Sequence, residues 1–214
     1  ATDACSSVTW SNDYSTLSDN CGASGLVLVT FTATDDCGNA TMTSATFTIQ
    51  DTTVPTINVL AADVTVECDG NGNAADLQNW LASNGGASAT DTCSSVTWSN
   101  DYSALSDDCG ASGSVLVTFT ATDDCGNSST SSATFTIQDT TAPTINVLAS
   151  DLTVECDGNG NAVDLQSWLA SNGGASATDA CSSVTWSNDY STLSDDCGAS
   201  GLVLVTFTAT DDCG

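Results

Sequence analysis

The sequence repeats itself with a period of 88 residues, and this repetition constrains the fold more than any other feature. The segment Cys-Ser-Ser-Val-Thr-Trp-Ser-Asn-Asp-Tyr-Ser begins at Cys5, again at Cys93 and again at Cys181. Residues 1–88 and 89–176 are identical at 75 of 88 positions. A period of this length is too long for a solenoid repeat. It predicts a string of small β domains with nearly identical cores.

Proline marks the predicted boundary between these domains. Pro55 follows Asp-Thr-Thr-Val, Pro143 follows Asp-Thr-Thr-Ala, and each lies between two strand-like runs. Because proline fixes its own backbone and restricts the residue before it, an extended linker is expected at both places. The predicted domains are a partial repeat at 1–54, a complete repeat at 55–142 and a partial repeat at 143–214. From this division we expect the chain to be a segment of a longer repetitive protein.

The complete repeat has the pattern of β-strands with one helix. Alternating apolar and polar residues predict strands at 56–68 and in three later segments. Asn73 is predicted to cap a helix that ends at Gly85. We therefore predict an all-β fold of tandem immunoglobulin-like β-sandwich domains, each with a short helical insert and stapled by disulfides. The predicted core residues are Ile57, Val59, Val64, Val66, Ala74, Leu77, Trp80, Leu81, Val96, Trp98, Val115, Val117, Phe119, Ala121, Ala133, Phe135 and Ile137.

Three segments of the repeat resemble a known family. These are the linker Asp-Thr-Thr-x-Pro-Thr-Ile at 51–57, Phe-Thr-Ala-Thr-Asp-Asp-Cys-Gly-Asn at 31–39, and Ala-Thr-Phe-Thr-Ile-Gln-Asp at 45–51. Together they resemble the hyalin-repeat (HYR-like) modules of very large secreted surface proteins and adhesins, notably of Bacteroidota. The resemblance covers the whole repeat, although the helical insert around Trp80 is longer than a minimal module needs. It implies an immunoglobulin-like fold and a role in adhesion or as a stalk.

The charge of the chain excludes several classes of function. It carries 27 acidic residues and no lysine, arginine or histidine, so no ion pair between side chains can form. Binding to nucleic acid or to anionic lipid depends on basic residues, so we expect neither partner. No run approaches the roughly 20 apolar residues of a membrane span, so direct membrane insertion is not expected. Without histidine, lysine or arginine, we also expect no enzymatic activity.

Eleven cysteines at repeated spacing, without Cys-x-x-Cys pairs, predict disulfides and an extracellular or cell-surface location. Bridged residues need Cα atoms within about 7 Å, so we expect pairs between strand ends at the same level of one domain. Cys21 is left over, and we expect either a partner upstream of residue 1 or a free buried thiol. The predicted pairs are Cys93–Cys125, Cys68–Cys109, Cys5–Cys37, Cys156–Cys197 and Cys181–Cys213.

These pairs are expected to gather aspartates at the ends of each domain. Clusters of oxygen ligands without nitrogen or sulfur suit Ca²⁺, which takes six to eight oxygens. The alternative is that the aspartates cap turns through their own backbone, with sodium screening the charge. The predicted calcium ligands are Asp3, Asp35, Asp36, Asp51, Asp91, Asp123, Asp124, Asp139, Asp179, Asp211 and Asp212.

Other motifs give weaker signals. The loop at 69–76 begins like an EF-hand, but it has Ala74 in place of the required glycine and Trp80 in place of the final acid. We therefore expect a turn there, with a looser calcium loop as the alternative. Asn39 and Asn127 lie in N-glycosylation sequons, and Thr52 and Thr140 in candidate O-glycosylation sites.

These observations favour a structural function. We expect a segment of a long extracellular filament or adhesin stalk, stiffened by calcium at the domain junctions, with further copies of the same repeat as its partners. The alternative is a binding module in which each repeat holds a glycan or another surface ligand. The loop Ser-Asn-Asp-Tyr-Ser, with Asp101 and Tyr102, is the candidate for that ligand site.

Overall fold

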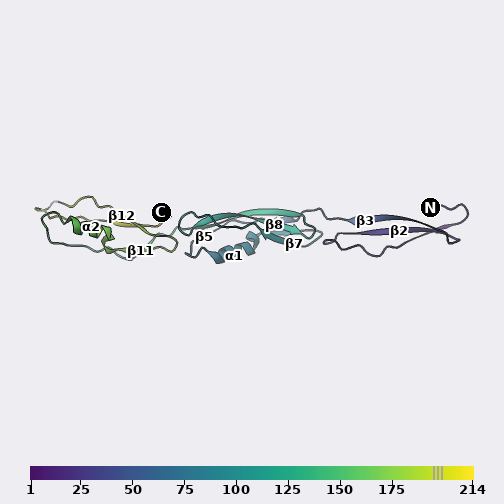
Figure 1. Cartoon of the computed structure of the whole chain (residues 1–214), viewed down its shortest axis with the longest axis horizontal. Coiled ribbons are helices and arrows are strands. Elements are labelled where there is room, and N and C mark those ends of the chain that lie inside the picture. Colours follow the sequence, from purple (N-terminus) through teal and green to yellow (C-terminus); the bar gives the residue numbers. More distant parts are fainter. Residues whose placement is uncertain (195, 197, 199) are drawn as a thin grey trace. The chain divides into compact units, whose positions relative to one another are not determined.

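The structure is a computed structural model that describes residues 1–194, 196, 198 and 200–214. These residues form two compact units. Figure 1 shows the helices and strands of the chain, coloured along the sequence. Each unit contains residues from two consecutive sequence repeats, so the units follow contacts across the repeat boundary. The first unit comprises Ala1–Ala62, Trp80–Tyr102 and Val117–Ala133; the second comprises Asp63–Asn79, Ser103–Leu116 and Thr134–Gly214.

The first unit contains a three-stranded antiparallel sheet in the order β1-β2-β3. The strands are β1 (Val8–Asn12), β2 (Gly25–Asp35) and β3 (Ala40–Ile49), which are joined in sequence order. A separate antiparallel pair joins β4 (Thr56–Val59) to β6 (Ser88–Thr90). The chain is therefore mostly β, as the alternation of apolar and polar residues predicts.

The complete repeat contributes a four-stranded sheet in the order β5-β9-β8-β7. Its strands are β5 (Val64–Glu67), β7 (Val96–Asn100), β8 (Gly113–Asp123) and β9 (Ser128–Gln138). The edge strand β5 runs parallel to β9, whereas β7 and β8 are antiparallel. Strands β8 and β9 each contribute residues to both units.

The remaining elements recur in successive repeats. Helix α1 (Ala74–Ala82) and the short η1 (Asn84–Gly86) have the counterparts α2 (Ala162–Ala170) and η2 (Asn172–Gly174). Strand β10 (Thr144–Val147) pairs with β11 (Ser176–Thr178), and β12 (Thr185–Asn188) pairs with β13 (Phe207–Thr210). Within the described residues, no helix is long and apolar enough to cross a membrane.

Trp80 fixes the helical insert against β8. Its ring meets Phe119 edge to face, with centroids 5.2 Å apart, and its indole N–H donates to the carbonyl oxygen of Ala62 at 3.1 Å. Gly85 follows the helix with a φ of 65°, and a Cβ there would lie 2.9 Å from the Phe119 ring. Glycine is required here by both the backbone conformation and the close ring. The predicted helix is confirmed, and it ends at Ala82, three residues before this glycine.

The core lies mainly in the complete repeat. Eight predicted core residues are buried: Leu77, Trp80, Val117, Phe119, Ala121, Ala133, Phe135 and Ile137. Others are only half-buried, namely Ile57, Val64, Val66, Leu81, Val96, Trp98 and Val115. Val59 and Ala74 are exposed, which corrects their prediction as core residues. The period of two therefore identifies the inward face of β9 and of most of β8 but overestimates burial in β4, β5 and β7.

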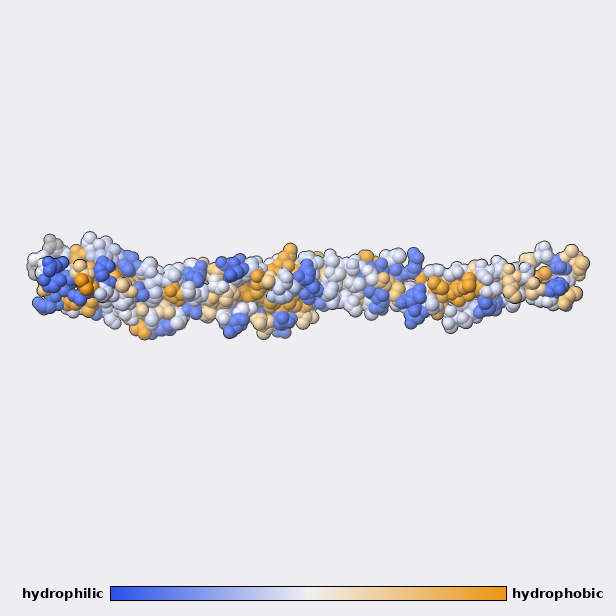
Figure 2. All heavy atoms as spheres, viewed as in Figure 1, coloured by the Kyte–Doolittle hydropathy of each residue, from blue (hydrophilic) through white to orange (hydrophobic). Residues whose placement is uncertain are grey.

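The first repeat shows the same strands without the same burial. Phe47 is 59% exposed, whereas Phe135, at the same position of the next repeat, is 0% exposed. Residues 1–54 correspond to 89–142, whereas β4, β5 and α1 of the second repeat lie within residues 56–82. Figure 2 shows hydrophobic residues (orange) at the surface. The strands of the two repeats are nearly identical in sequence. The difference in their exposure therefore comes from the segments that cover each sheet.

The strand predicted at 56–68 is interrupted in the structure. Residues 60–63 separate β4 from β5, and the two strands belong to different sheets. Within the interruption, the N–H of Ala61 donates to the Ser131 hydroxyl at 2.9 Å, and the N–H of Ala62 donates to the carbonyl of Gly85 at 2.9 Å. These hydrogen bonds to a side chain and to a loop replace hydrogen bonds between strands. The chain can therefore pass from the sheet of β4 to the sheet of β5 at this point.

Candidate functional site

Two disulfides occupy equivalent positions one repeat apart. Each lies at a junction, by which we mean the boundary between two consecutive repeats. Cys21 is bonded to Cys125, and Cys109 is bonded to Cys213, each across 104 residues of sequence. The Cα–Cα distances are 5.1 and 5.4 Å, within the normal range of disulfides. Since Cys109 is Cys21 shifted by one repeat, and Cys213 is Cys125 shifted by one repeat, each bond joins a repeat to the next one.

A third disulfide strengthens the second junction. Cys68 is bonded to Cys181 across 113 residues, with a Cα–Cα distance of 6.0 Å. Cys93 is the counterpart of Cys181 one repeat earlier, and here it is a half-buried free thiol. Among the described residues, Cys5 and Cys37 are exposed free thiols. Counting only cysteines in the described part of the chain, the junction between the second and third repeats has two bridges, and the preceding junction has one.

The predicted disulfide pairing within each repeat was wrong. The pairs that do not form are Cys93–Cys125, Cys68–Cys109, Cys5–Cys37 and Cys181–Cys213. Cys21, for which an upstream partner or a free thiol was expected, is bonded to Cys125. The predicted pair Cys156–Cys197 includes Cys197, which lies outside the described residues. The error arose because the prediction compared strand ends within one repeat and left out the next repeat.

Backbone contacts between repeats bring the bonded sulfurs together. The N–H of Ala23 donates to the carbonyl of Cys93 at 2.7 Å, and the N–H of Ala111 donates to the carbonyl of Cys181 at 2.8 Å. Each donor lies two residues after a bonded cysteine. A Cβ on Gly110 would lie 2.5 Å from the Cys181 oxygen, so only glycine allows this approach. The turn of one repeat therefore rests directly on the backbone of the next.

Many of the predicted calcium ligands cap turns. Oδ1 of Asp91 accepts the N–H groups of Cys93 at 2.8 Å and Ser94 at 3.1 Å. Asp3 and Asp179 accept the equivalent pairs of N–H groups in their own repeats. These are Asx turns, in which the side chain replaces a backbone carbonyl. The alternative interpretation of the aspartates therefore describes what these side chains do in the structure.

The Asp-Asp-Cys-Gly-Asn turns are also closed by their own side chains. Oδ1 of Asp123 accepts the N–H groups of Cys125 at 2.9 Å and Asn127 at 2.8 Å. In the first repeat, the side-chain amide and backbone N–H of Asn39 hold the pKa of Asp35 below its ordinary value. The other carboxylates of these turns are bonded too: Asp36 by Ser7, Asp124 by Ser95, Asp211 by Cys213 and Gly214, and Asp212 by Ser183.

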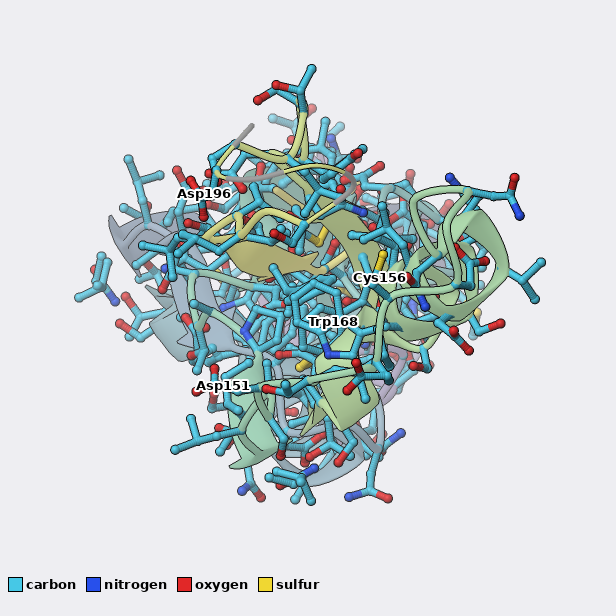
Figure 3. The ribbon with its side chains drawn as sticks, turned by 90° about the vertical axis from the view of Figure 1, so that its left-hand side faces the viewer. Asp151, Cys156, Trp168 and Asp196 are labelled. Carbon is cyan, nitrogen blue, oxygen red and sulfur yellow. A yellow bond between two sulfur atoms is a disulfide. The ribbon has the colours of Figure 1, made fainter. Side chains whose placement is uncertain are left out.

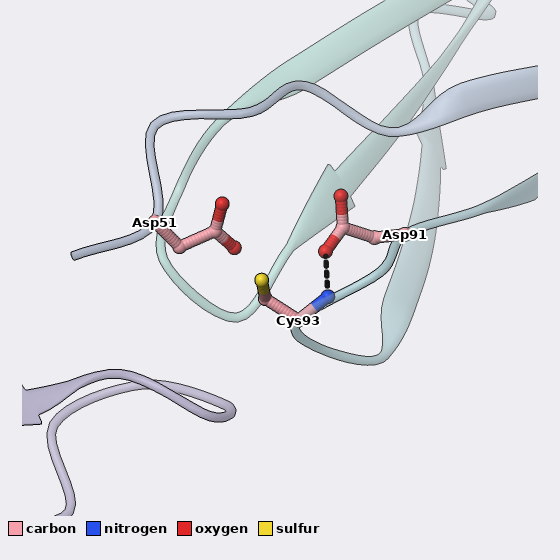
Figure 4. A group of neighbouring side chains, drawn as sticks. All are labelled: Asp51, Asp91 and Cys93. Atoms are coloured by element: carbon pink, nitrogen blue, oxygen red, sulfur yellow. Dashed lines mark hydrogen bonds between the residues drawn. The ribbon is translucent and has the colours of Figure 1, made fainter. Parts of the chain in front are cut away.

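Two aspartates meet a cysteine beside the first junction (Figure 4). One atom each from Asp51, Asp91 and Cys93 lies within 4.8 Å of the other two. Oδ1 of Asp51 accepts the N–H of Thr53 at 3.0 Å, whereas its Oδ2 is buried and has no hydrogen-bond partner. Burial, together with the charges of Asp51, Asp91 and Asp123, raises the pKa of the Cys93 thiol. We call this group the junction cluster.

The junction cluster recurs one repeat later. Asp139, Asp179 and Cys181 have the same arrangement, and Oδ2 of Asp139 is again buried without a hydrogen-bond partner. In this copy the cysteine sulfur is bonded to Cys68. Both clusters therefore combine two carboxylates, one of them with an unsatisfied oxygen, with a cysteine. This cysteine is a free thiol in the first cluster and is bonded to the preceding repeat in the second.

The loop at 69–76 binds its own backbone. Oδ1 of Asp69 accepts the N–H groups of Asn71 at 2.7 Å and Asn73 at 3.0 Å. Asn73 is 3% exposed, and its amide donates to the carbonyl of Glu67 at 2.9 Å and to Asp76 at 3.1 Å. Asn73 therefore precedes the helix as predicted, but its side chain holds the loop together.

Glu67 has a role that the sequence analysis missed. Its Oε1 accepts the N–H of Thr140 at 2.7 Å and the hydroxyl of Thr141 at 3.0 Å, so β5 is held to the following linker. The N–H of Thr140 is the main reason that the pKa of Glu67 lies below its ordinary value. The available signal was that Glu67 and Glu155 are the only glutamates among 27 acids.

The candidate modification and ligand residues differ in accessibility. Asn39 and Thr52 are exposed, whereas Asn127 is half-buried and its amide donates to Asp123 at 2.8 Å. Thr140 is exposed, and its hydroxyl donates to Glu67 at 3.0 Å. The candidate ligand loop is less open than expected, because its tyrosine is half-buried and the carboxylate of its aspartate accepts a backbone N–H at 2.7 Å.

A cavity of about 580 Å³ lies in the third repeat. It is lined by residues 151–156 and 200–203 and by Leu165 and Trp168; Figure 3 labels Asp151, Cys156 and Trp168. In the second repeat, β9 pairs with the counterpart of residues 152–155, namely β5. Residues 143–214 correspond to 55–126, whereas β9 of the second repeat is Ser128–Gln138. The cavity therefore lies where β9 packs one repeat earlier.

No protein-family model matches the chain, and no curated protein sequence matches it.

Proposed function

We propose that the chain is a structural segment of a long extracellular filament or adhesin stalk, in which disulfides close the junctions between repeats. The observation that carries this proposal is the recurrence of the Cys21–Cys125 bond as Cys109–Cys213. A bond that recurs with the sequence period joins any number of repeats in the same way. Disulfides persist in oxidising compartments, which supports an extracellular location. The partners of each repeat are further copies of itself.

An immunoglobulin-like sandwich is the fold we infer for each repeat. In its support, β7, β8 and β9 form one side of the complete repeat, and β5 adds to β9 in parallel. The pair β4 and β6 forms a second, separate sheet. Sandwiches of this class bury alternate residues of their strands. Alternate residues of β8 and β9 are buried at 117–121 and 133–137, which supports this inference.

The free thiol of Cys93 is part of the same proposal. Its surroundings match those of Cys181. The carbonyl oxygen of Cys93 accepts the N–H of Ala23 at 2.7 Å, and that of Cys181 accepts the N–H of Ala111, one repeat later, at 2.8 Å. Cys181 is bonded to Cys68 of the repeat before it. We infer that in longer arrays Cys93 is bonded in the same way to a preceding repeat, so that every junction has two bridges.

Calcium at the junction cluster is the cofactor that we propose. A buried carboxylate oxygen without a partner is unfavourable, and Oδ2 of Asp51 and of Asp139 are both in that state. Asp91 and Asp179 bring the second carboxylate of each cluster. Carboxylate oxygens are ligands that Ca²⁺ prefers, whereas a disulfide sulfur is not. A bound cation would neutralise the paired charges beside each bridge and so stiffen the junction.

Replacing both Asp51 and Asp139 by asparagine is expected to abolish the response to calcium. In the unchanged protein, a hundredfold excess of Ca²⁺ over its Kd should raise the free energy of unfolding by about 2.7 kcal/mol for each occupied cluster. The matched control replaces Asp36 and Asp124, whose carboxylates are bonded to serines, and should keep the response. The measurement is thermal unfolding in EDTA and in millimolar Ca²⁺ at fixed ionic strength. Identical melting in both would contradict calcium binding.

A filament segment should grow in length by a constant step with each repeat. Strands of about ten residues at roughly 3.3 Å per residue predict about 35 to 40 Å for each added repeat. Small-angle scattering of chains lengthened by one, two and four copies of residues 55–142 tests this expectation. A radius of gyration that barely changes with the number of repeats would contradict the structural role.

A further inference from the structure

We propose that tension along the chain is carried by a covalent line made of β-strands and disulfides. The line runs from Cys37 along β2 to Cys21, across the bond to Cys125, along β8 to Cys109, and across the bond to Cys213. Each repeat contributes one strand and one bridge to this line. The remainder of each repeat lies outside it.

The line has little slack. The segment 109–125 connects the two bonded cysteines of the second repeat, and β8 occupies most of it, as the 11 residues Gly113–Asp123. A β-strand rises about 3.3 Å per residue, close to the roughly 3.3 to 3.6 Å of a fully extended chain. Strand β8 is therefore almost fully extended before any load is applied. Only the short turns at its two ends can lengthen.

The line is also the shortest covalent route through the molecule. The backbone route from Cys21 to Cys213 includes every residue between them, whereas the line includes only the segment 109–125. The route through the Cys68–Cys181 bridge includes the longer segments 21–68 and 181–213. Tension therefore straightens the line first. The helix and the proline linkers remain slack.

The position of β8 in the fold protects this line. Strand β8 lies between β7 and β9 in the sheet, and Val117, Phe119 and Ala121 along it are fully buried. Because both ends of β8 are bonded to neighbouring repeats, force passes through its covalent backbone. No hydrogen bond between strands has to carry the load. A string of domains joined only by linkers would transmit the same force through such hydrogen bonds, and its domains would unfold.

This inference deepens the proposed structural function by naming what bears load in it, but its evidence is the disulfide pairing alone. If scattering contradicted the filament and pulling showed the predicted short extension, the covalent line would stand and the proposed function would fail. If scattering supported the filament and pulling showed a long extension, the covalent line would be contradicted and the proposed function would stand.

Single-molecule pulling between tags at the two termini measures the covalent route directly. With free thiols alkylated and disulfides intact, the shortest route includes only the segments 1–21, 109–125 and 213–214. At about 3.5 Å per residue plus two bridges, the distance between the tags should stop increasing at about 140 Å. After reduction, the whole backbone should extend to about 750 Å, roughly fivefold further.

Two variants distinguish this line from other covalent routes. Replacing Cys125 by alanine should move the load to the Cys68–Cys181 bridge and lengthen the extension to about 350 Å. Replacing Cys93, which is a free thiol, should leave the full extension at about 140 Å. An oxidised chain that extends as far as the reduced one, or a Cys125→Ala chain that stops at the same length as the unchanged protein, would overturn the inference.

Discussion

Replacing Cys109 and Cys213 together by alanine is expected to lower the free energy of unfolding by about 4 kcal/mol. The bridge closes a loop of 104 residues, and such a loop restricts the unfolded chain strongly. The overlapping Cys68–Cys181 bridge already restricts part of this segment, so the effective loop is somewhat shorter. Urea unfolding of the oxidised protein measures the difference.

The matched control replaces Cys5 and Cys37, which belong to the first repeat. Both are exposed free thiols in this structure, so their loss should change the free energy of unfolding by less than about 0.5 kcal/mol. If this pair bonded with each other, as within-repeat pairing requires, the control would be as destabilising as the first variant. Equal losses would therefore contradict the bridges between repeats.

The second large effect is expected at Phe135. This side chain is fully buried, so replacing it by alanine removes its apolar contacts and leaves a cavity. Such substitutions cost about 3 to 5 kcal/mol. Phe47 holds the same position one repeat earlier within an identical segment, Ser-Ala-Thr-Phe-Thr-Ile-Gln, but it is 59% exposed. Replacing Phe47 should change stability by less than about 0.5 kcal/mol.

Calorimetry of the two alanine variants provides the comparison. Since the local sequences are identical, a difference in stability loss between the two variants comes from the elements that cover each phenylalanine. It does not come from the intrinsic strand propensity of the sequence. A loss at Phe47 as large as that at Phe135 would mean that the first sheet is covered in solution and that its apolar face is buried.

This pair of residues also shows how far the sequence predicts the fold. The period of two places Phe119, Phe135 and Ile137 on the inward face, and the structure confirms it. The same pattern is present in the first repeat, where the face is open. A local pattern identifies which side of a strand is apolar, whereas burial depends on segments that are distant in sequence. The pattern also missed the interruption at 60–63, where the chain changes sheet.

The disulfides could not be paired from the sequence for a related reason. Spacing arguments within one repeat place Cys93 and Cys125 at one end of a domain and Cys68 and Cys109 at the other. What decides the pairing is the contact of the next repeat, through the N–H of Ala111 and its partner carbonyl. Near-identical repeats give no signal that distinguishes a bond within a repeat from one between repeats, because both recur with the same period.

The aspartates, in contrast, carried a readable local signal. In Asp-x-Cys, the carboxylate lies two residues before the cysteine, which is the spacing of an Asx turn. Asp91 and Asp123 both accept the N–H of that cysteine, at 2.8 and 2.9 Å. What the sequence could not show is the proximity of Asp51 to Asp91, since the two lie far apart along the chain and only the fold brings them together.

The central claim, that disulfides join consecutive repeats, can be tested by cutting the chain at its two glutamates. Glu67 and Glu155 are exposed, and cleavage after them gives the fragments 1–67, 68–155 and 156–214. The Cys21–Cys125 bond joins the first fragment to the second, and the Cys68–Cys181 and Cys109–Cys213 bonds join the second to the third.

The digestion uses a glutamyl endopeptidase in urea, after free thiols have been alkylated at acidic pH to prevent exchange, with the products weighed by mass spectrometry. Before reduction, the structure predicts one species with the mass of the whole chain plus two water molecules and the alkyl groups. Reduction should separate it into three fragments. Disulfides confined to single repeats would instead release all three fragments before any reductant is added, and that result would contradict the account.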